Sequence, residues 1–135
     1  MIVDTSVWIE YLRPGASDAG DYLENLIFTG STIMVPETVV MELLSGTTDE
    51  VIALDRRRML EAFDLIAFVP LADSLRAASL QRACRRAGET VRNLGDCQIA
   101  AVALRLDLPV VHRDRDFEVL AEHTGLRTVS LLPVQ

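Results

Sequence analysis

Residues 1–12 read Met-Ile-Val-Asp-Thr-Ser-Val-Trp-Ile-Glu-Tyr-Leu, and this stretch contains the pattern on which the fold depends. Its first three residues are apolar and predict a very short buried strand, Met1–Val3. Asp4 follows, and Thr5 or Ser6 is then placed to be the N-cap of a helix over Val7–Leu12. An acid therefore stands at the point where the chain passes from a strand into a helix.

The same alternation of short apolar segments and longer helical segments continues along the chain. The further strands that we predict are Thr32–Val35, Leu65–Val69, Pro109–His112 and Thr128–Leu131. The further helices that we predict are Asp18–Thr29, Pro36–Gly46, Asp49–Phe63, Leu71–Ala87, Asp96–Leu106 and Asp116–His123. Strands and helices that alternate at this spacing predict right-handed crossovers and an α/β fold with a mostly parallel, buried sheet.

The length and composition of the chain limit the class of protein. Its 135 residues most simply form one domain, residues 1–135, which is large enough to bury a core without disulfides. Cys84 and Cys97 lack the spacing of a disulfide framework, and so we predict two free thiols. No apolar run approaches the roughly 18 residues of a membrane-spanning helix, and so we expect a soluble, cytoplasmic protein.

Four acids share a placement near the start of a helix: Asp4, Glu42, Asp96 and Asp114. Asp4 and Asp114 follow predicted strands, at the edge of the sheet where the carboxyl ends of parallel strands form a crevice for ligands. Glu42 lies less than two turns into its helix, and because helical side chains lean toward the N-terminus it can reach the same crevice. Asp96 begins its helix, where the helix dipole favours an anion.

Taken singly, Asp96 is typical of a helix cap and Asp114 of a turn. Glu42 is harder to explain in this way, because its helix is apolar nearly all round and a lone glutamate there is costly unless it is paired or metal-bound. The sequence contains no lysine, and no arginine lies in that segment. Four converging carboxylates would repel one another strongly unless divalent cations lay between them, and so the set predicts a Mg²⁺ or Mn²⁺ site.

The formal charge of −7 argues at first against a nucleic-acid partner, but setting the four acids aside as metal ligands leaves −3. The chain contains 13 arginines and no lysine. The guanidinium group of arginine can bind two phosphate oxygens at once. The arginines that we expect to contact RNA are Arg82, Arg85 and Arg86 on one helix face, Arg92 in the next loop, and Arg113 and Arg115 beside Asp114. The alternatives are a solvated helix face for the first three and salt bridges to the acids for the last two. Trp8 either stacks on a base or packs in the core.

Four stretches resemble the motifs of PIN-domain ribonucleases of the VapC toxin type. They are Met1–Ser6, Pro36–Leu43, Gly95–Ala103 and Arg113–Phe117, in the order of that family and spread over essentially the whole chain. The resemblance implies a three-layer α/β/α PIN-like domain with a sheet of four to five strands. By resemblance, Asp4, Glu42, Asp96 and Asp114 match the catalytic, metal-binding acids of the family, with Asp116 as a fifth ligand and Thr5 or Ser6 as the polar residue beside the first aspartate.

The resemblance also implies an activity and partners. It implies a Mg²⁺-dependent endoribonuclease, with Mn²⁺ as the alternative ion, in which an activated water attacks the phosphodiester in line. The protein would be a toxin that inhibits translation and growth, restrained by a small antitoxin bound in a hydrophobic groove, and it would form a homodimer. The apolar helices around Val7–Leu12 and Val39–Leu44 are where we expect that groove. Single-stranded RNA loops are the expected substrate, because their bases can splay outward.

One position departs from the family pattern. The family usually has Thr or Ser two residues before the fourth acid, and this chain has His112. We expect the imidazole to take over the supporting role of the hydroxyl, as a donor to a ligand carboxylate. A metal ligand or a general base is the alternative for His112.

Two other classes of protein remain as alternatives. A non-catalytic PIN-like module that binds RNA or protein would typically have lost one or more of the acids, and this chain keeps all of them. A Mg²⁺-dependent phosphatase or phosphoacceptor domain would call for paired acids after the first strand and a late lysine. Here the first strand ends in Asp4-Thr5-Ser6 and lysine is absent, so this class is the weaker alternative.

Overall fold

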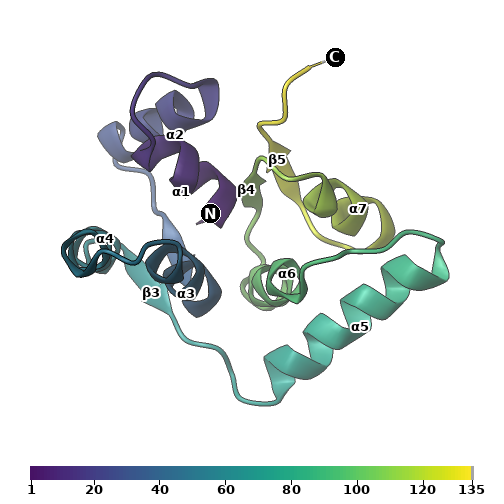
Figure 1. Ribbon diagram of the computed structural model, residues 1–135. Helices are drawn as coiled ribbons and strands as arrows, with labels where there is room; N and C mark the ends of the chain where they lie inside the picture. The colour runs from purple at the N-terminus through teal and green to yellow at the C-terminus, as the bar shows by residue number, and fades with distance from the viewer. Residues whose placement is uncertain (135) are drawn as a thin grey trace.

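The computed structural model describes residues 1–134, and in it five short strands form one parallel sheet. The strands are β1 (Ile2–Val3), β2 (Met34–Pro36), β3 (Asp64–Ile66), β4 (Val110–His112) and β5 (Thr128–Ser130), arranged in the order β3-β2-β1-β4-β5 (Figure 1). The helices are α1 (Thr5–Leu12), α2 (Asp18–Phe28), α3 (Glu37–Ser45), α4 (Glu50–Glu61), α5 (Ala72–Arg86), α6 (Leu94–Leu106) and α7 (Arg115–His123). The prediction of an α/β fold with a parallel sheet is confirmed.

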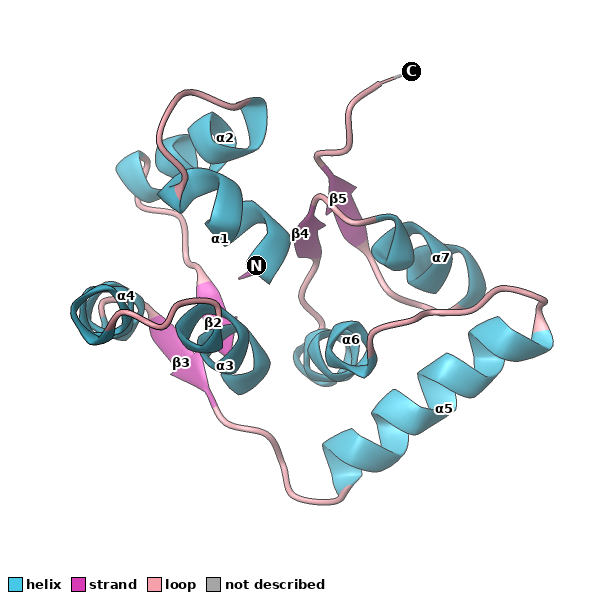
Figure 2. Ribbon diagram, in the orientation of Figure 1, coloured by secondary structure: helices cyan, strands magenta, loops and turns pink. Residues whose placement is uncertain are grey.

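The helices form two groups that cover opposite faces of the sheet. The chain moves from β1 to β3 in one direction across the sheet and from β3 to β5 in the other. Because crossovers between parallel strands are right-handed, this reversal places α1 to α4 on one face and α5 to α7 on the other. In Figure 2, α1 and α2 lie on one side of the strands, and α5, α6 and α7 lie on the other. This is the three-layer α/β/α arrangement.

The connections that leave β1 and β4 run in opposite directions across the sheet, and these two strands are neighbours at its centre. Val3 pairs with Val111, and the Asp4 amide donates a hydrogen bond of 2.9 Å to the Val111 carbonyl. The segments that leave β1 and β4 therefore start side by side. In open parallel sheets, ligands bind in the crevice at such a switch point.

The core lies on both faces of these central strands. Trp8 of α1 is fully buried, and its ring packs edge-on against Phe63 at a centroid distance of 5.3 Å. On the other face, Phe117 of α7 and the run Ile99–Ala103 of α6 are fully buried. Trp8 is therefore a core residue. Cys84 and Cys97 are buried free thiols, as predicted. No helix among residues 1–134 has the length and apolar character needed to cross a bilayer.

Several element boundaries differ from the predicted ones, for local reasons. The N-cap of α1 is Asp4 rather than Thr5 or Ser6, because the Asp4 carboxylate accepts the Ser6 amide at 3.1 Å. The third strand ends at Ile66 rather than Val69, since side-chain carboxylates take the next backbone amides: Glu37 accepts from Phe68 and Asp73 from Val69. Asn93 caps α6, which begins before Asp96.

Candidate metal site

The acids singled out in the sequence converge at the switch point between β1 and β4. Carboxylate oxygens of Asp96, Asp114 and Asp116 lie within 4.8 Å of one another. Asp4 and Glu42 are outside this tightest group, but they are close enough to raise the pKa of Asp96 by charge repulsion. Five acids from β1, α3, α6 and α7 thus face a common centre.

Asp4 is held at the end of β1 by its neighbour Ser6. The side chain is 2% exposed, and its Oδ2 atom accepts the Ser6 hydroxyl at 2.5 Å and the Ser6 amide at 3.1 Å. Burial raises the pKa of Asp4 to about 6; the hydrogen bonds from Ser6 oppose that rise, and Glu42 adds to it. Asp4 therefore has a fixed orientation and a carboxylate that burial makes costly to ionise.

Glu42 is held by donors from two different elements. Thr5 Oγ1 of α1 donates to Glu42 Oε1 at 2.9 Å, and Asn93 Nδ2 donates to Glu42 Oε2 at 3.4 Å. Neither donor is charged, which agrees with the absence of a basic residue from the sequence around Glu42. The two contacts hold the carboxylate toward α1 and α6, across the crevice.

Asp96 is the most perturbed acid of the group. It lies in the first turn of α6 and is 3% exposed, and its Oδ2 atom is buried without a hydrogen-bond partner among residues 1–134. Burial raises the pKa of Asp96 to about 8, and repulsion from Asp4, Asp114, Asp116 and Glu42 adds to the rise. A buried, unpaired carboxylate oxygen that faces other acids is unfavourable unless a cation is present.

Asp114 and Asp116 complete the group from the start of α7. Asp114 is the N-cap of that helix, and its Oδ1 atom accepts the Asp116 amide at 2.9 Å. Asp116 accepts the backbone amide of Arg92 at 3.3 Å, which joins the loop between α5 and α6 to α7. Both side chains are partly exposed, so the site opens to solvent on this side.

His112 supports the site, but not in the way expected from the sequence. Its Nδ1 atom accepts the Asp114 amide at 3.2 Å, so it is not a donor to a ligand carboxylate. The ring is fully buried, packs on Phe117 and lies with Nε2 at 3.9 Å from Glu118. Burial lowers the pKa of His112, which keeps the imidazole neutral and able to accept. The imidazole therefore holds the backbone at Asp114.

The arginines fall into three groups. Arg92 and Arg115 are exposed and, with Asp114 and Asp116, line a hollow of about 460 Å³ beside the acids. Arg82, Arg85 and Arg86 are exposed together on the last turns of α5. Arg113 is different, because its Nη1 atom lies 3.3 Å from the nearly buried Glu10 carboxylate. Of the two arginines beside Asp114, only Arg115 lines the hollow.

Two further side chains of the site have no strong signal in the sequence. Asn93 caps α6, a role that an asparagine just before a helix indicates, but nothing local in the sequence indicates its contact with Glu42. Glu10 lies on the apolar helix that follows Asp4 and is not among the predicted site residues, yet its carboxylate binds Arg13 at 3.0 Å and Arg113 at 3.3 Å. An acid one turn or more after Asp4 on the same helix was the available signal for Glu10.

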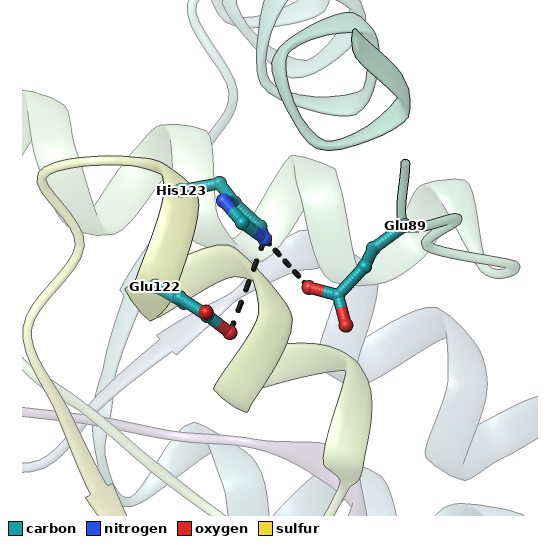
Figure 3. A group of neighbouring side chains, drawn as sticks. All are labelled: Glu89, Glu122 and His123. Atoms are coloured by element: carbon teal, nitrogen blue, oxygen red, sulfur yellow. Dashed lines mark hydrogen bonds and ion pairs between the residues drawn. The ribbon is translucent and has the colours of Figure 1, made fainter. Parts of the chain in front are cut away.

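A second group of titratable side chains lies toward the other end of α7, and its Glu89 lines the same hollow as Asp114 and Asp116. His123, in the last turn of α7, lies between Glu122 and Glu89, with Nε2 at 2.5 Å from Glu89 and 3.9 Å from Glu122 (Figure 3). Glu89 belongs to the loop between α5 and α6. The short contact therefore joins that loop to α7 near its C-terminus, as the Arg92–Asp116 hydrogen bond does at the other end of the helix.

The donor set of the main site fits a divalent cation. All five acids offer oxygen atoms, which Mg²⁺ and Mn²⁺ prefer, and the Oδ2 atom of Asp96 is buried without a hydrogen-bond partner among residues 1–134, which leaves it available to an ion. A cation would also lower the pKa values of Asp4 and Asp96, which burial and repulsion now raise. The residues present therefore fit a hard metal ion.

Comparisons with known proteins agree with this geometry. Residues 1–123 match the PIN domain family. The chain is 38% identical over 131 residues to VapC ribonuclease Mb1587 of Mycobacterium bovis and to ribonuclease VapC11 of Mycobacterium tuberculosis, covering 96% of this chain and 98% of each relative.

Solved structures share the fold at lower identity. VapBC2 from Rickettsia felis, bound to a fragment of its promoter DNA, superposes with a TM-score of 0.74 at 17% identity, covering 96% of each chain. FitAB bound to IR36 DNA gives a TM-score of 0.75 at 20% identity, covering 99% of this chain and 96% of the other. The chain belongs to the PIN-domain family and, within it, to the VapC ribonucleases.

Proposed function

We propose that this protein is the toxin of a toxin–antitoxin pair and that it cleaves RNA as a divalent-metal-dependent endoribonuclease. Its membership of the VapC ribonucleases supports the activity. The single observation that carries the metal dependence is the buried, unpaired Oδ2 atom of Asp96 among four further acids. This arrangement argues against a non-catalytic PIN-like module. In such a module, five converging acids would repel one another and destabilise the fold without serving a function.

The residues that would hold the ion are Asp4, Glu42, Asp96, Asp114 and Asp116, and Mg²⁺ is the ion we propose, with Mn²⁺ as a substitute. When bound, the ion supplies Lewis-acid chemistry: it acidifies water and neutralises charge on the phosphodiester. The protein contributes orientation. Ser6 fixes Asp4, Thr5 and Asn93 fix Glu42, and His112 fixes the backbone at Asp114.

The attacking water needs an acceptor that orients it toward the phosphorus atom. Asp96 is our candidate, because its second carboxylate oxygen remains available to accept from the water when the buried, unpartnered Oδ2 atom holds the ion. Attack by water on the phosphorus, with cleavage of the P–O3′ bond and protonation of the departing 3′-oxygen, leaves a 5′-phosphate and a 3′-hydroxyl end, unlike attack by the ribose 2′-hydroxyl. The ends of the product therefore report which nucleophile is used.

The RNA would approach over the hollow that Arg92 and Arg115 line beside Asp114 and Asp116. Their guanidinium groups can bind the phosphates next to the scissile bond. Arg82, Arg85 and Arg86 of α5 would contact phosphates farther along the strand. Arg113 is a poorer candidate for an RNA contact than Arg92 and Arg115, because its guanidinium already pairs with Glu10.

The antitoxin would bind an apolar surface. A hollow of about 620 Å³, lined mainly by apolar side chains, lies between α3 and β3, where Val40 and Met41 face Leu65 and Phe68. A smaller hollow of about 240 Å³ lies beside Ile9 and Leu12 of α1. Both adjoin the helices expected from the sequence. The solved VapBC structures, which contain both toxin and antitoxin, support a partner of this kind. A homodimer remains a prediction.

Cleavage of structured RNA tests the proposal. We expect the purified chain to cleave RNA in Mg²⁺, to lose the activity in chelator and to regain it when Mg²⁺ or Mn²⁺ is restored. Asp4→Asn removes a charge at the centre of the site and should abolish cleavage, whereas Asp55→Asn on the exposed face of α4 should not. Cleavage that continues in chelator, or in Asp4→Asn, would refute the metal-dependent mechanism.

A further inference from the structure

The carboxylate of Glu42 is held at both of its oxygen atoms by uncharged donors. Thr5 donates to Oε1 and Asn93 donates to Oε2. Thr5 directly follows Asp4, so its contact is part of the strand end that carries that acid. Asn93 is different, because it comes from a loop 51 residues later in the chain and lies just before the helix that carries Asp96.

The two ends of the Asn93 amide have separate tasks. Its Oδ1 atom accepts the Gly95 amide at 2.8 Å and so caps α6, while its Nδ2 atom faces Glu42. The Asn93 carbonyl also accepts the Asp96 amide at 3.1 Å. Asp, Ser or Thr would cap the helix about as well, but none of them has a donor that reaches Glu42 in addition to the capping oxygen.

The space around Asn93 is also built for this side chain. A Cβ atom added at Gly95 would lie 3.0 Å from Asn93 Oδ1 and 3.3 Å from Thr38 Cγ2 of α3. The glycine therefore leaves room for the amide between α3 and α6. One turn earlier on α3, Thr38 Oγ1 donates to Gln98 Oε1 of α6 at 3.2 Å, which is a second bridge between these helices that does not touch an acid.

We infer that Asn93 is a positioning residue of the metal site: its amide sets the place of Glu42 relative to Asp96 by bridging α3 to the N-terminus of α6. This inference rests on the proposed function, since it assigns a role toward the metal that the five acids would hold. The amide donor partly offsets the charge of Glu42, which forms no ion pair with an arginine or histidine among residues 1–134, and it leaves the carboxylate oriented toward the other acids. Without this donor the helix cap can persist while Glu42 loses its orientation.

The test separates the capping task from the donating task. Asn93→Ser and Asn93→Thr each keep a capping oxygen but remove the amide Nδ2 donor that faces Glu42, and their single, shorter hydroxyl is engaged at the cap. Thr38→Val, which is nearly isosteric, breaks the other bridge between α3 and α6 and is the matched control. Binding of Mn²⁺ to the full chain is measured from the electron paramagnetic resonance signal of the free ion, and thermal unfolding in chelator reports the cap.

We expect both Asn93 variants to bind Mn²⁺ about 10-fold more weakly, as is typical when a side chain that orients a ligand is lost. Their unfolding temperatures in chelator should stay close to that of the unaltered chain, and Thr38→Val should bind Mn²⁺ normally. Cleavage by Asn93→Ser should recover at high Mn²⁺ concentration with an unchanged KM for RNA.

One result would overturn the inference while leaving the nuclease intact: an unaltered Mn²⁺ affinity in both Asn93 variants. A raised KM for RNA together with that normal Mn²⁺ affinity would make Asn93 an RNA contact. If the unaltered chain itself binds no Mn²⁺, the proposed function fails together with the inference. The two failures are therefore distinguishable.

Discussion

Thr5 Oγ1 lies 2.9 Å from Glu42 Oε1 and donates a hydrogen bond to it across 37 positions of sequence. Thr5 is the first residue of α1, and Glu42 lies on α3. The hydrogen bond therefore joins the strand end that carries Asp4 to the helix that carries Glu42. A hydroxyl in the first turn of α1 thus contributes directly to the shape of the acidic site.

Replacing this hydroxyl by a methyl group should weaken the site without unfolding the chain. Thr5→Val keeps the shape of a side chain that is 8% exposed but removes the donor to Glu42. We expect a fall in cleavage rate at low Mg²⁺ concentration of roughly 10-fold, because a ligand loses its orienting partner. Steady-state cleavage over a range of Mg²⁺ concentrations measures it. Thr48→Val, in the exposed turn before α4, is the control, and equal losses in both variants would contradict the assignment.

The stability of the metal-free protein should fall as the pH rises. The pKa of Asp4 is raised to about 6 and that of Asp96 to about 8, both from 3.8, so the folded state holds more protons than the unfolded state between about pH 4 and pH 8. Raising the pH through this range then favours unfolding. Thermal unfolding in chelator from pH 5 to pH 8 measures the trend, and added Mg²⁺ should reverse it at pH 8.

Asp96→Asn provides the control for this trend. The amide cannot ionise, and so the variant should be more stable than the unaltered metal-free chain at pH 8, on the order of a few kcal/mol since each unit of pKa shift is worth about 1.4 kcal/mol. At pH 4 the difference should shrink, because Asp96 is then protonated in the folded state and about half protonated in the unfolded state. The variant should also gain less stability from Mg²⁺. If the stability of the unaltered metal-free chain does not change between pH 5 and pH 8, the raised pKa assigned to Asp96 is wrong.

The types and order of the elements could be predicted from the sequence because their signals are local. Short apolar runs such as Val110–Val111 and the acids that follow them identify strands that end at a common edge. The convergence of Asp4 with Asp114 depends in addition on β1 and β4 being neighbours, which the sheet order shows. The exact ends of elements depend on side chains that compete for backbone amides, as Asp73 does at Val69, and this competition has no local signal.

The contacts that shape the site were harder to predict, because each depends on where a distant element lies. Asn93 before a helix is a typical cap, and only the position of α3 reveals its contact with Glu42. Arg113 is next to Asp114 in sequence, but successive side chains leaving a strand point to opposite sides, and Arg113 reaches Glu10 instead. The direction of the His112 hydrogen bond could not be predicted from the sequence, because it depends on the backbone geometry at Asp114.

Trp8 should matter for stability and not for RNA binding. Its ring is fully buried and packs edge-on against Phe63 and Tyr11, so it cannot stack on a base. We expect Trp8→Ala to lower the free energy of unfolding by about 3–5 kcal/mol, as is usual for a large aromatic residue lost from a core. Urea unfolding measures this loss. Trp8→Phe should keep the fold, and its affinity for RNA in chelator should equal that of the unaltered chain; a clear loss of affinity would restore the stacking alternative.

The arginines of α5 should govern the salt dependence of RNA binding. Arg82 and Arg86 are exposed near its C-terminal end, just before the loop that leads to Asn93, and neither is needed for the core. If each neutralises one phosphate of a single strand, replacing both by alanine should reduce the slope of log affinity against log salt by about 0.7 for each lost contact.

Fluorescence anisotropy with labelled RNA in chelator, from low to moderate salt, measures this slope. Arg57→Ala with Arg58→Ala on α4 is the matched pair, because these exposed arginines lie on the other face of the sheet, where Arg57 pairs with Glu61 at 2.8 Å. The α5 pair should lower both the affinity and the slope, while the α4 pair should change neither. Equal effects of the two pairs would mean that RNA responds to the overall charge of the protein, and that α5 is a solvated helix face.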